Sequence, residues 1–316
     1  MQAAVRTEYG GPVHLADVPT PEVGPDQVLI DVHAAGLDRG VLHLAEGTPY
    51  ALRLVFGMRR PKRPVLGLDL AGTVAAVGTD VTRWAVGDEV LGIGMGTFAA
   101  QSAALERKLV AKPAALSFAE AAALPISGLT ALQAIEAADI QGNQRVLVLG
   151  ASGGVGVYAV QLAAARGAEV VAVCSAGKAE RVQALGAKEV LDYRSDALPG
   201  GFDVILAIGG NAHVRTLRAA LQPKGQLLAV GGEGGGQILG IGRQIRAVAL
   251  NPFVGQRLGM FMSKESGEDL QRLVDLVEDG VVRPIVGARY PLSDAAQALA
   301  DMAAGRLFGK AVLEVA

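Results

Sequence analysis

The sequence feature that most constrains the fold is a glycine-rich loop between an expected strand and an expected helix. Val146–Leu149 is a short apolar run, small residues and glycines follow it, and a helical pattern extends over Val155–Arg166. Glycine lets the chain turn sharply after the strand and lets the helix pack closely against it. The free N–H groups at the start of the helix favour a phosphate group. The pattern predicts a dinucleotide-binding loop, although glycines alone also suit an ordinary strand-to-helix turn.

The loop residues expected to contact a dinucleotide follow one another in the chain. Three of them occupy the fingerprint positions for such a loop, with alanine in the first glycine position. The expected contact residues are Ala151, Ser152, Gly153, Gly154, Val155 and Gly156.

Strands and helices alternate after this loop. A strand is expected at Glu169–Cys174, a helix at Lys178–Leu185 and a further strand at Val204–Ala207. This alternation predicts an α/β fold with a doubly wound parallel sheet. The first hundred residues instead show short strand patterns interrupted by glycine and proline, which indicates a β-rich domain.

The length of the chain predicts two domains. A single core rarely grows to 316 residues. We expect the β-rich domain to be discontinuous, with residues 1–120 and 261–316, and the dinucleotide-binding domain to cover residues 121–260. The last strand, Lys310–Val315, is expected to return to the first domain. Between the domains, Ser117 and Glu120 form a capping box at a helix start, and Pro125 is expected to interrupt that helix.

The residues after the second strand indicate which dinucleotide binds. An NAD site has an acidic residue about 20 positions after the loop. Ser175 lies 19 positions after Gly156, no acid stands there, and Lys178 follows. A hydroxyl and an ammonium attract a 2′-phosphate, whereas a carboxylate repels it. We therefore predict NADPH; the alternative for Lys178 is a solvated helix lysine.

Composition excludes several other functions. The net charge of −2 offers no overall attraction for nucleic acid or an anionic membrane, and no apolar run is long enough for a membrane span. One cysteine, Cys174, excludes an internal disulfide. We therefore expect a cytoplasmic protein. The basic run Arg59–Arg63 is expected to be an exposed loop, and its role stays open.

Motifs spread over nearly the whole chain resemble one known family. The chain is similar to the medium-chain dehydrogenase/reductase superfamily, in its zinc-free quinone oxidoreductase (zeta-crystallin-like) branch. The matching segments are 19–21 with 27–29, 67–74 with 77–78, 87–90, 121–125 with 128–131, 153–156, 185–187, 192–194 and 309–312.

This resemblance implies a GroES-like domain, a Rossmann domain and a cofactor in the cleft between them. It also implies a homodimer formed through an edge of the Rossmann sheet. Lys178 and Tyr193, 15 positions apart, correspond to a lysine and a tyrosine that hold the 2′-phosphate in this branch. Phe253 is a candidate to flank the nicotinamide; the alternative is that it is a residue of the hydrophobic core. Further cofactor contacts are expected at Thr130, Gly231, Gly232 and Lys310.

The resemblance also locates the positions where zinc-bearing relatives hold their metal. Asp38, Leu68 and Ser127 stand there in this chain. Leucine cannot bind a metal, and the cysteine and histidine ligands that zinc prefers are missing. We therefore expect no metal in the site.

Without a metal, the site suits hydride addition to a conjugated acceptor. Hydride adds to a quinone or an α,β-unsaturated carbonyl compound, and a donor holds the oxygen on which negative charge develops. The catalytic candidates are Asp38, His43 and Tyr50. An ionised Asp38 only accepts hydrogen bonds, so it either orients a neighbour or merely forms a turn. His43 is either a donor or a packing residue, and Tyr50 either lines the substrate site or covers its loop.

Two alternative functions remain open at this point. One is a zinc-free, NAD(P)-dependent alcohol or carbonyl dehydrogenase. The other is an NADPH-binding sensor with little catalysis. The small-molecule substrate cannot be named from the sequence, because one fold supports many reactions.

Overall fold

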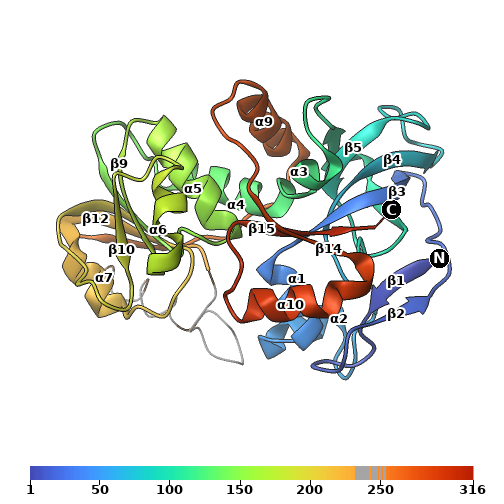
Figure 1. The fold of residues 1–316 in the computed structure, drawn as a ribbon, viewed down its shortest axis with the longest axis horizontal. Coiled ribbons are helices and arrows are strands. Elements are labelled where there is room, and N and C mark those ends of the chain that lie inside the picture. The colour runs from blue at the N-terminus through green and yellow to red at the C-terminus, as the bar shows by residue number, and fades with distance from the viewer. Residues whose placement is uncertain (232–241, 243–247, 249–250, 252–253, 316) are drawn as a thin grey trace. The chain divides into compact units, whose positions relative to one another are not determined.

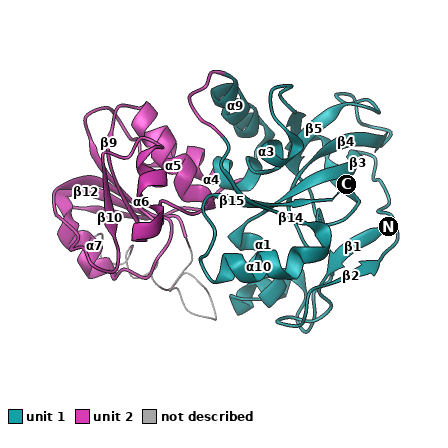
Figure 2. Cartoon of the chain, viewed as in Figure 1, with its two compact units in different colours: residues 1–129, 265–278, 284–316 teal, residues 130–264, 279–283 magenta. Residues whose placement is uncertain are grey.

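The computed structural model describes residues 1–231, 242, 248, 251 and 254–315, and it divides the chain into two compact units (Figures 1 and 2). Unit 1 comprises residues 1–129, 265–278 and 284–316, and unit 2 comprises residues 130–264 and 279–283. The sequence analysis placed the boundaries at 120/121 and 260/261. The first boundary lies later in the structure because helix α3 (Phe118–Ala122) packs against strands of unit 1.

Unit 1 is built on a seven-stranded sheet in the order β14-β15-β3-β4-β5-β7, with β6 also paired to β3. Two strands near the N-terminus, β1 (Gln2–Val5) and β2 (His14–Asp17), form a separate two-stranded sheet. The last strand pairs antiparallel with β3, which confirms that the C-terminal tail returns to this domain. The sheet strands are β3 (Gln27–Leu37), β4 (Asp69–Val77), β5 (Glu89–Ile93), β6 (Gln101–Leu105), β7 (Leu109–Ala111), β14 (Val286–Pro291) and β15 (Lys310–Glu314).

Short helices of unit 1 follow β3 and precede β4. The sequence analysis described only strands here and missed α1 (Arg39–Glu46), the 3-10 turn η1 (Tyr50–Leu52) and α2 (Arg53–Phe56). Helix α1 buries Val41, Leu42 and Ala45 on one face and ends at Gly47, whose φ of 62° is a left-handed cap. Its eight residues offer too few turns for a strong periodic signal.

The capping box and the break at Pro125 are both confirmed. The Ser117 hydroxyl accepts the Glu120 N–H at 3.3 Å, and the Glu120 carboxylate accepts the Ser117 N–H at 2.9 Å. Helix α3 ends at Ala122, and Pro125 is the first residue of the next helix, α4 (Pro125–Ala137). Proline suits a first helical position, where its missing N–H would have no partner. The other helices of unit 1 are α9 (Gly267–Glu278) and α10 (Ala295–Ala303).

The core of unit 1 contains an ion pair among apolar side chains. The Lys310 ammonium lies 2.8 Å from the Asp69 carboxylate, with 1% and 0% of the two side chains exposed. These residues begin β15 and β4, the two strands that flank this end of β3. At Gly36 of β3, a Cβ atom would lie 3.0 Å from the Asp69 Cβ atom and 2.3 Å from the Ala122 carbonyl oxygen. Only glycine therefore fits beside the pair.

Unit 2 is a six-stranded sheet whose neighbouring strands are all parallel. The order β10-β9-β8-β11-β12-β13 is 3-2-1-4-5-6 when the strands are counted along the chain. This is the Rossmann order, and it confirms the predicted doubly wound sheet. The elements are β8 (Arg145–Leu149), α5 (Gly154–Ala165), β9 (Glu169–Cys174), α6 (Ala179–Gln183), β10 (Glu189–Asp192), β11 (Phe202–Ala207), α7 (Val214–Ala220), β12 (Leu221–Ala229) and β13 (Arg257–Met260).

A search of the described residues for a membrane-spanning helix found none of sufficient length and hydropathy.

The buried ion pair generates a stability prediction. Lys310→Met keeps the apolar length of the side chain but leaves the Asp69 carboxylate buried without its counter-ion. Removing one partner of a buried pair costs about 3–5 kcal/mol. We therefore expect a large fall in the calorimetric unfolding temperature of unit 1.

The matched control is Arg289→Met on the adjacent strand. Arg289 and Glu314 form a pair at 3.0 Å between β14 and β15, but about half of each side chain is exposed, at 49% and 47%. Losing such a pair costs about 0–1 kcal/mol. Equal unfolding temperatures for the two variants would contradict the importance of the buried pair.

Candidate functional site

The loops after β8 and β11 approach each other at the point where the strand order of unit 2 reverses. Gly150 has a φ of 77°, and a Cβ atom there would lie 2.8 Å from the Gly209 nitrogen. A Cβ atom at Gly156 would lie 2.2 Å from the Gly150 carbonyl oxygen. Both positions therefore require glycine. In open α/β sheets this switch point, at the carboxyl ends of the strands, is where ligands bind.

The N-terminus of α5 fits a phosphate group. Gly153 is its N-cap and provides no side-chain cap. Gly153 is exposed, and Ser152, Gly154 and Val155 are half-buried, while Ala151 and Gly156 are buried in the loop packing. A twelve-residue helix that begins with bare N–H groups stabilises a negative charge. The residues present therefore fit the pyrophosphate of a dinucleotide.

Ser175, Lys178 and Tyr193 lie at the carboxyl ends of two neighbouring strands. Asp192 of β10 pairs with Cys174 of β9, and the Tyr193 N–H donates to the Cys174 carbonyl at 3.2 Å. The structure thus brings together the three residues expected to hold a 2′-phosphate. Burial lowers the pKa of Lys178, and Tyr193 is 59% exposed.

Two further expected cofactor residues of unit 2 are described. Gly231 follows β12, and a Cβ atom there would lie 2.0 Å from the Ile208 carbonyl oxygen, so this loop also requires glycine. Thr130 is a half-buried residue inside α4. Gly232 and Phe253 lie outside the described residues.

Lys310 has a different environment from the one expected for a cofactor contact. Its ammonium is bound to Asp69 inside unit 1 and is almost completely buried. The other carboxylate oxygen of Asp69 accepts the Ile126 N–H at 2.9 Å. Sequence reasoning missed Asp69, although a carboxylate at the start of an apolar strand is a signal that a buried partner is needed.

Asp38 places a second carboxyl group beside this pair. Because Ala311 of β15 pairs with Leu37 of β3, Lys310 comes next to Asp38. Asp38 is 6% exposed and caps α1, where its Oδ1 atom accepts the Val41 N–H at 3.1 Å. Its Oδ2 atom is buried and has no hydrogen-bond partner among the described residues.

Burial raises the pKa of both carboxyl groups. The pKa of Asp69 is raised to about 6, because burial outweighs the attraction of Lys310 and the nearby Asp38 acts in the same direction as burial. The pKa of Asp38 is raised by burial against the opposing charge of Lys310. Asp69 has the direct bond to the ammonium, whereas Asp38 has an unpaired oxygen. The two carboxyl groups share one buried ammonium, so burial disfavours a negative charge on both of them at once.

The other two catalytic candidates lie in different surroundings. His43 is half-buried on α1, and its charge acts to lower the pKa of Asp38. Tyr50 is 45% exposed, and the Arg53 guanidinium lies 4.7 Å from its ring centroid. No hydrogen bond, ion pair or ring contact joins Tyr50 to Asp38 or to His43 in the part of the chain that the structure describes.

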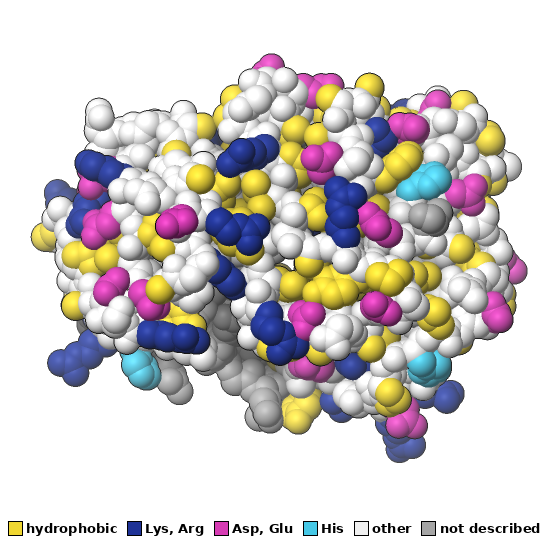
Figure 3. Space-filling model, in the orientation of Figure 1, with side chains coloured by type: hydrophobic (Ala, Val, Ile, Leu, Met, Phe, Trp, Pro, Cys, Tyr) yellow, Lys and Arg dark blue, Asp and Glu magenta, His cyan; other side chains and the backbone are white. Residues whose placement is uncertain are grey.

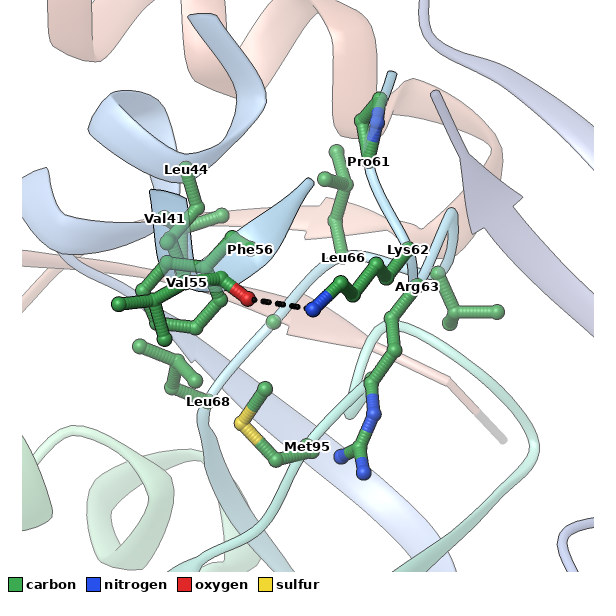
Figure 4. A pocket seen from close by; sticks show the side chains of 13 residues that line it. Val41, Leu44, Val55, Phe56, Pro61, Lys62, Arg63, Leu66, Leu68 and Met95 are labelled. Carbon is green, nitrogen blue, oxygen red and sulfur yellow. Dashed lines mark hydrogen bonds between the residues drawn. The ribbon is translucent and has the colours of Figure 1, made fainter. Parts of the chain in front are cut away.

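An apolar cavity of about 370 Å³ lies in unit 1 beside α1 (Figure 4). Lys62 and Arg63 of the basic run also line it. Sequence reasoning noticed this run as a loop but not its proximity to a cavity. The main apolar lining residues are Val41, Leu44, Val55, Phe56, Leu68 and Met95.

Known proteins are similar to this chain over nearly its full length. Two family models match it, the alcohol dehydrogenase GroES-like domain over residues 24–132 and one described as zinc-binding dehydrogenase over residues 185–313. The chain is 31% identical to the chloroplast envelope quinone oxidoreductase homolog of Arabidopsis thaliana, covering 99% of this chain and 98% of that protein.

Two further proteins are similar over the full length. The chain is 33% identical to the 2-methylene-furan-3-one reductase of Solanum lycopersicum, covering 99% of this chain and 79% of that protein. A mycobacterial protein solved in complex with NADPH has a TM-score of 0.84 and 27% identity, with 100% of both chains covered.

The zinc in one family description does not fit the residues of this chain. Leu68 has no donor atom, and Asp38 carries a raised pKa that disfavours the ionised form a metal needs. Within the described ranges, no group of three His, Cys, Asp or Glu side chains lies together as a metal site would require. These side chains therefore do not fit a zinc ion.

The raised pKa of Asp38 generates a prediction about pH and stability. The folded chain binds this proton more tightly than the unfolded chain, whose aspartates have a pKa of about 3.9. The resulting stabilisation is fully present below that pH and is lost as the pH rises through the folded pKa. Asp38→Asn keeps the helix cap and is neutral at every pH. The unfolding temperature of the variant, relative to wild type, should therefore rise as the pH increases above about 4.

Calorimetry of both proteins over a pH series measures this difference. The carboxyl carbon resonance of Asp38, followed by NMR through the same series, reports its ionisation directly. A difference that stays constant, or that falls with increasing pH, would show that the carboxyl group is not held neutral.

Proposed function

Because the chain belongs to the medium-chain dehydrogenase/reductase superfamily, in its zinc-free quinone oxidoreductase branch, we propose that it reduces quinones or α,β-unsaturated carbonyl compounds with NADPH. The observation that carries the proposal is the bare N-terminus of α5, at a switch point packed so closely that only glycine fits at position 156. The names of the two curated relatives, a quinone oxidoreductase homolog and a furanone reductase, support this class of acceptor.

Different residues support the binding of a nicotinamide dinucleotide and the preference for NADPH over NADH. The α5 loop and Gly231, with Gly232 and Thr130 by resemblance, suit either nicotinamide dinucleotide. The preference for NADPH rests on Ser175, Lys178 and Tyr193, which lie together at the ends of β9 and β10. The similar mycobacterial structure with NADPH supports the same choice. When bound, the reduced nicotinamide supplies a hydride.

We propose that Asp38 is the protonated member of the buried carboxyl pair and the acid of the reaction. Hydride addition to the β-carbon of an enone moves the double-bond electrons toward the carbonyl oxygen. Asp38 then supplies a proton through its free Oδ2 atom, so that the substrate gains one hydride and one proton. Lys310 lies close enough to stabilise the resulting carboxylate, which takes a new proton from water. In this proposal Lys310 acts through Asp38 and Asp69 and does not contact the substrate. His43 and Tyr50 stay candidates for contacts with the substrate.

The proposed assembly is a homodimer formed through the edge of the unit 2 sheet. Strand β13 is the last in the order of described strands. Met260 ends this strand and Met262 follows it, and they are 42% and 75% exposed. A strand at the edge of the described sheet, with exposed apolar side chains, favours pairing with a second copy. The cytoplasmic location expected from the sequence stays a prediction.

Parallel assays of three substrate classes test the proposed reaction. NADPH consumption is measured with a naphthoquinone, an enone and an aldehyde. We expect turnover of the first two, and Asp38→Asn should lower kcat for the enone by about 100-fold, in the range for loss of an acid catalyst. The dissociation constant of NADPH should stay the same in this variant.

The same assays distinguish the alternatives. Turnover of the aldehyde alone would favour the carbonyl dehydrogenase. Tight NADPH binding without turnover of any acceptor would favour the sensor and overturn the proposed function.

The cofactor preference is tested by Lys178→Glu. The change places a carboxylate where the 2′-phosphate is expected, so the dissociation constant of NADPH should rise by about tenfold or more while that of NADH changes little. Equilibrium fluorescence titration measures both constants. Lys224→Glu, the same charge reversal at an exposed position early in β12, is the control. Equal losses for NADPH and NADH would refute the assignment.

A further inference from the structure

The cavity beside α1 and the basic run are features that the proposed function leaves unexplained. The volume of about 370 Å³ is near the small end of the range for ligand pockets, about 300–1,000 Å³. Apolar side chains from α1, α2 and the segment before β4 form its walls (Figure 4). Val41 lines the cavity and donates its N–H to Asp38, so the cavity adjoins the proposed acid.

Lys62 is held at this cavity by a tightly closed loop. Its N–H donates to the Phe56 carbonyl at 2.8 Å, and its ammonium donates to the Val55 carbonyl at 3.1 Å (Figure 4). Gly57 closes the loop with a φ of 124°, and a Cβ atom there would lie 2.1 Å from the Arg60 carbonyl oxygen. An ammonium has three N–H donors, so two remain for a ligand.

Arg63 adds a second positive charge to the lining. It is exposed, and no hydrogen bond or ion pair to its guanidinium occurs among the residues that the structure describes. Residues 47–68 contain five Lys and Arg and no acid, although the whole chain has a net charge of −2. On the face drawn in Figure 3, by contrast, cations and acids are interspersed. The segment therefore concentrates positive potential beside an apolar cavity.

We propose that this cavity binds a substrate with an apolar body and an anionic end group, either a carboxylate or a phosphate, which Lys62 and Arg63 hold. The inference deepens the proposed function and rests on it, because the apolar body carries the conjugated carbonyl. A guanidinium and an ammonium bind such oxygens through charge-assisted hydrogen bonds. A neutral quinone would fill the apolar walls and leave both cations without a ligand.

Substrates that differ only at the end group test this inference. NADPH oxidation is measured with a medium-chain enone that carries a terminal carboxylate, with its phosphate analogue and with its methyl ester. We expect kcat/KM to favour at least one anionic form over the ester by about tenfold or more, the range for hydrogen bonds to charged groups. The two anionic arms distinguish carboxylate from phosphate. The double variant Lys62→Gln, Arg63→Gln should lose most of this preference.

The matched control is Arg59→Gln with Arg60→Gln. It removes the same charge from the same run, but neither residue lines the cavity. The preference for the anionic substrate should survive in this variant. Equal losses in the two double variants would show a general effect of charge and would overturn the inference.

A binding measurement separates this inference from the proposed function. Calorimetric titration with a saturated ketone bearing the same anionic end, without NADPH, reports binding without reaction. Binding that depends on Lys62 and Arg63 would support the anionic site even if no enone turned over. Turnover of acid, phosphate and ester with equal kcat/KM would overturn the inference and leave the proposed function standing.

Discussion

The buried ion pair between Lys310 and Asp69 is the interaction on which the rest of unit 1 depends. It joins the first residues of β15 and β4, which are 241 positions apart in the chain and flank the same strand, β3. Two charges inside an apolar core gain little net stability from each other, because removing both from water costs about as much as their attraction returns. The pair constrains the fold because separating the two buried charges would cost free energy. Any register that moved Lys310 away from Asp69 would leave two uncompensated charges, so the pair fixes where the last strand joins the sheet.

The same pair determines the charge environment of Asp38. The register that places Ala311 opposite Leu37 also places the ammonium next to a second buried carboxyl group. One ammonium compensates one carboxylate, and Asp69 has the direct contact. Burial raises the pKa of Asp38, because the low polarity around it disfavours another charge. The contact that fixes a strand register therefore also shapes the electrostatics of the residue proposed as the acid.

The parts of the fold that could be predicted are those recorded in local sequence. The strand–glycine–helix loop, the alternation after it and the Ser117–Glu120 capping box each need only a few consecutive residues, and the structure confirms the fold they predict. The break at Pro125 is local as well, since proline ends one helical run and suits the first position of the next. Helix α1 was missed because two turns give a weak period. The role of Lys310 was not accessible, because a partner 241 positions away leaves no local pattern.

The charge balance around Asp38 also suits the proposed reaction in a second way. With Asp38 protonated, as the proposed reaction requires, the group of Asp38, Asp69 and Lys310 carries one positive and one negative charge before the reaction, and its net charge is zero. Loss of the proton from Asp38 leaves one excess negative charge among buried atoms. The burial that raises the pKa of Asp38 then favours prompt return of a proton, so the acid is restored after each hydride transfer. An asparagine at this position would hold the substrate oxygen through its N–H group but would have no proton to give. The aspartate thus differs from an amide in chemistry rather than in shape, and that difference depends on Lys310 being already occupied by Asp69.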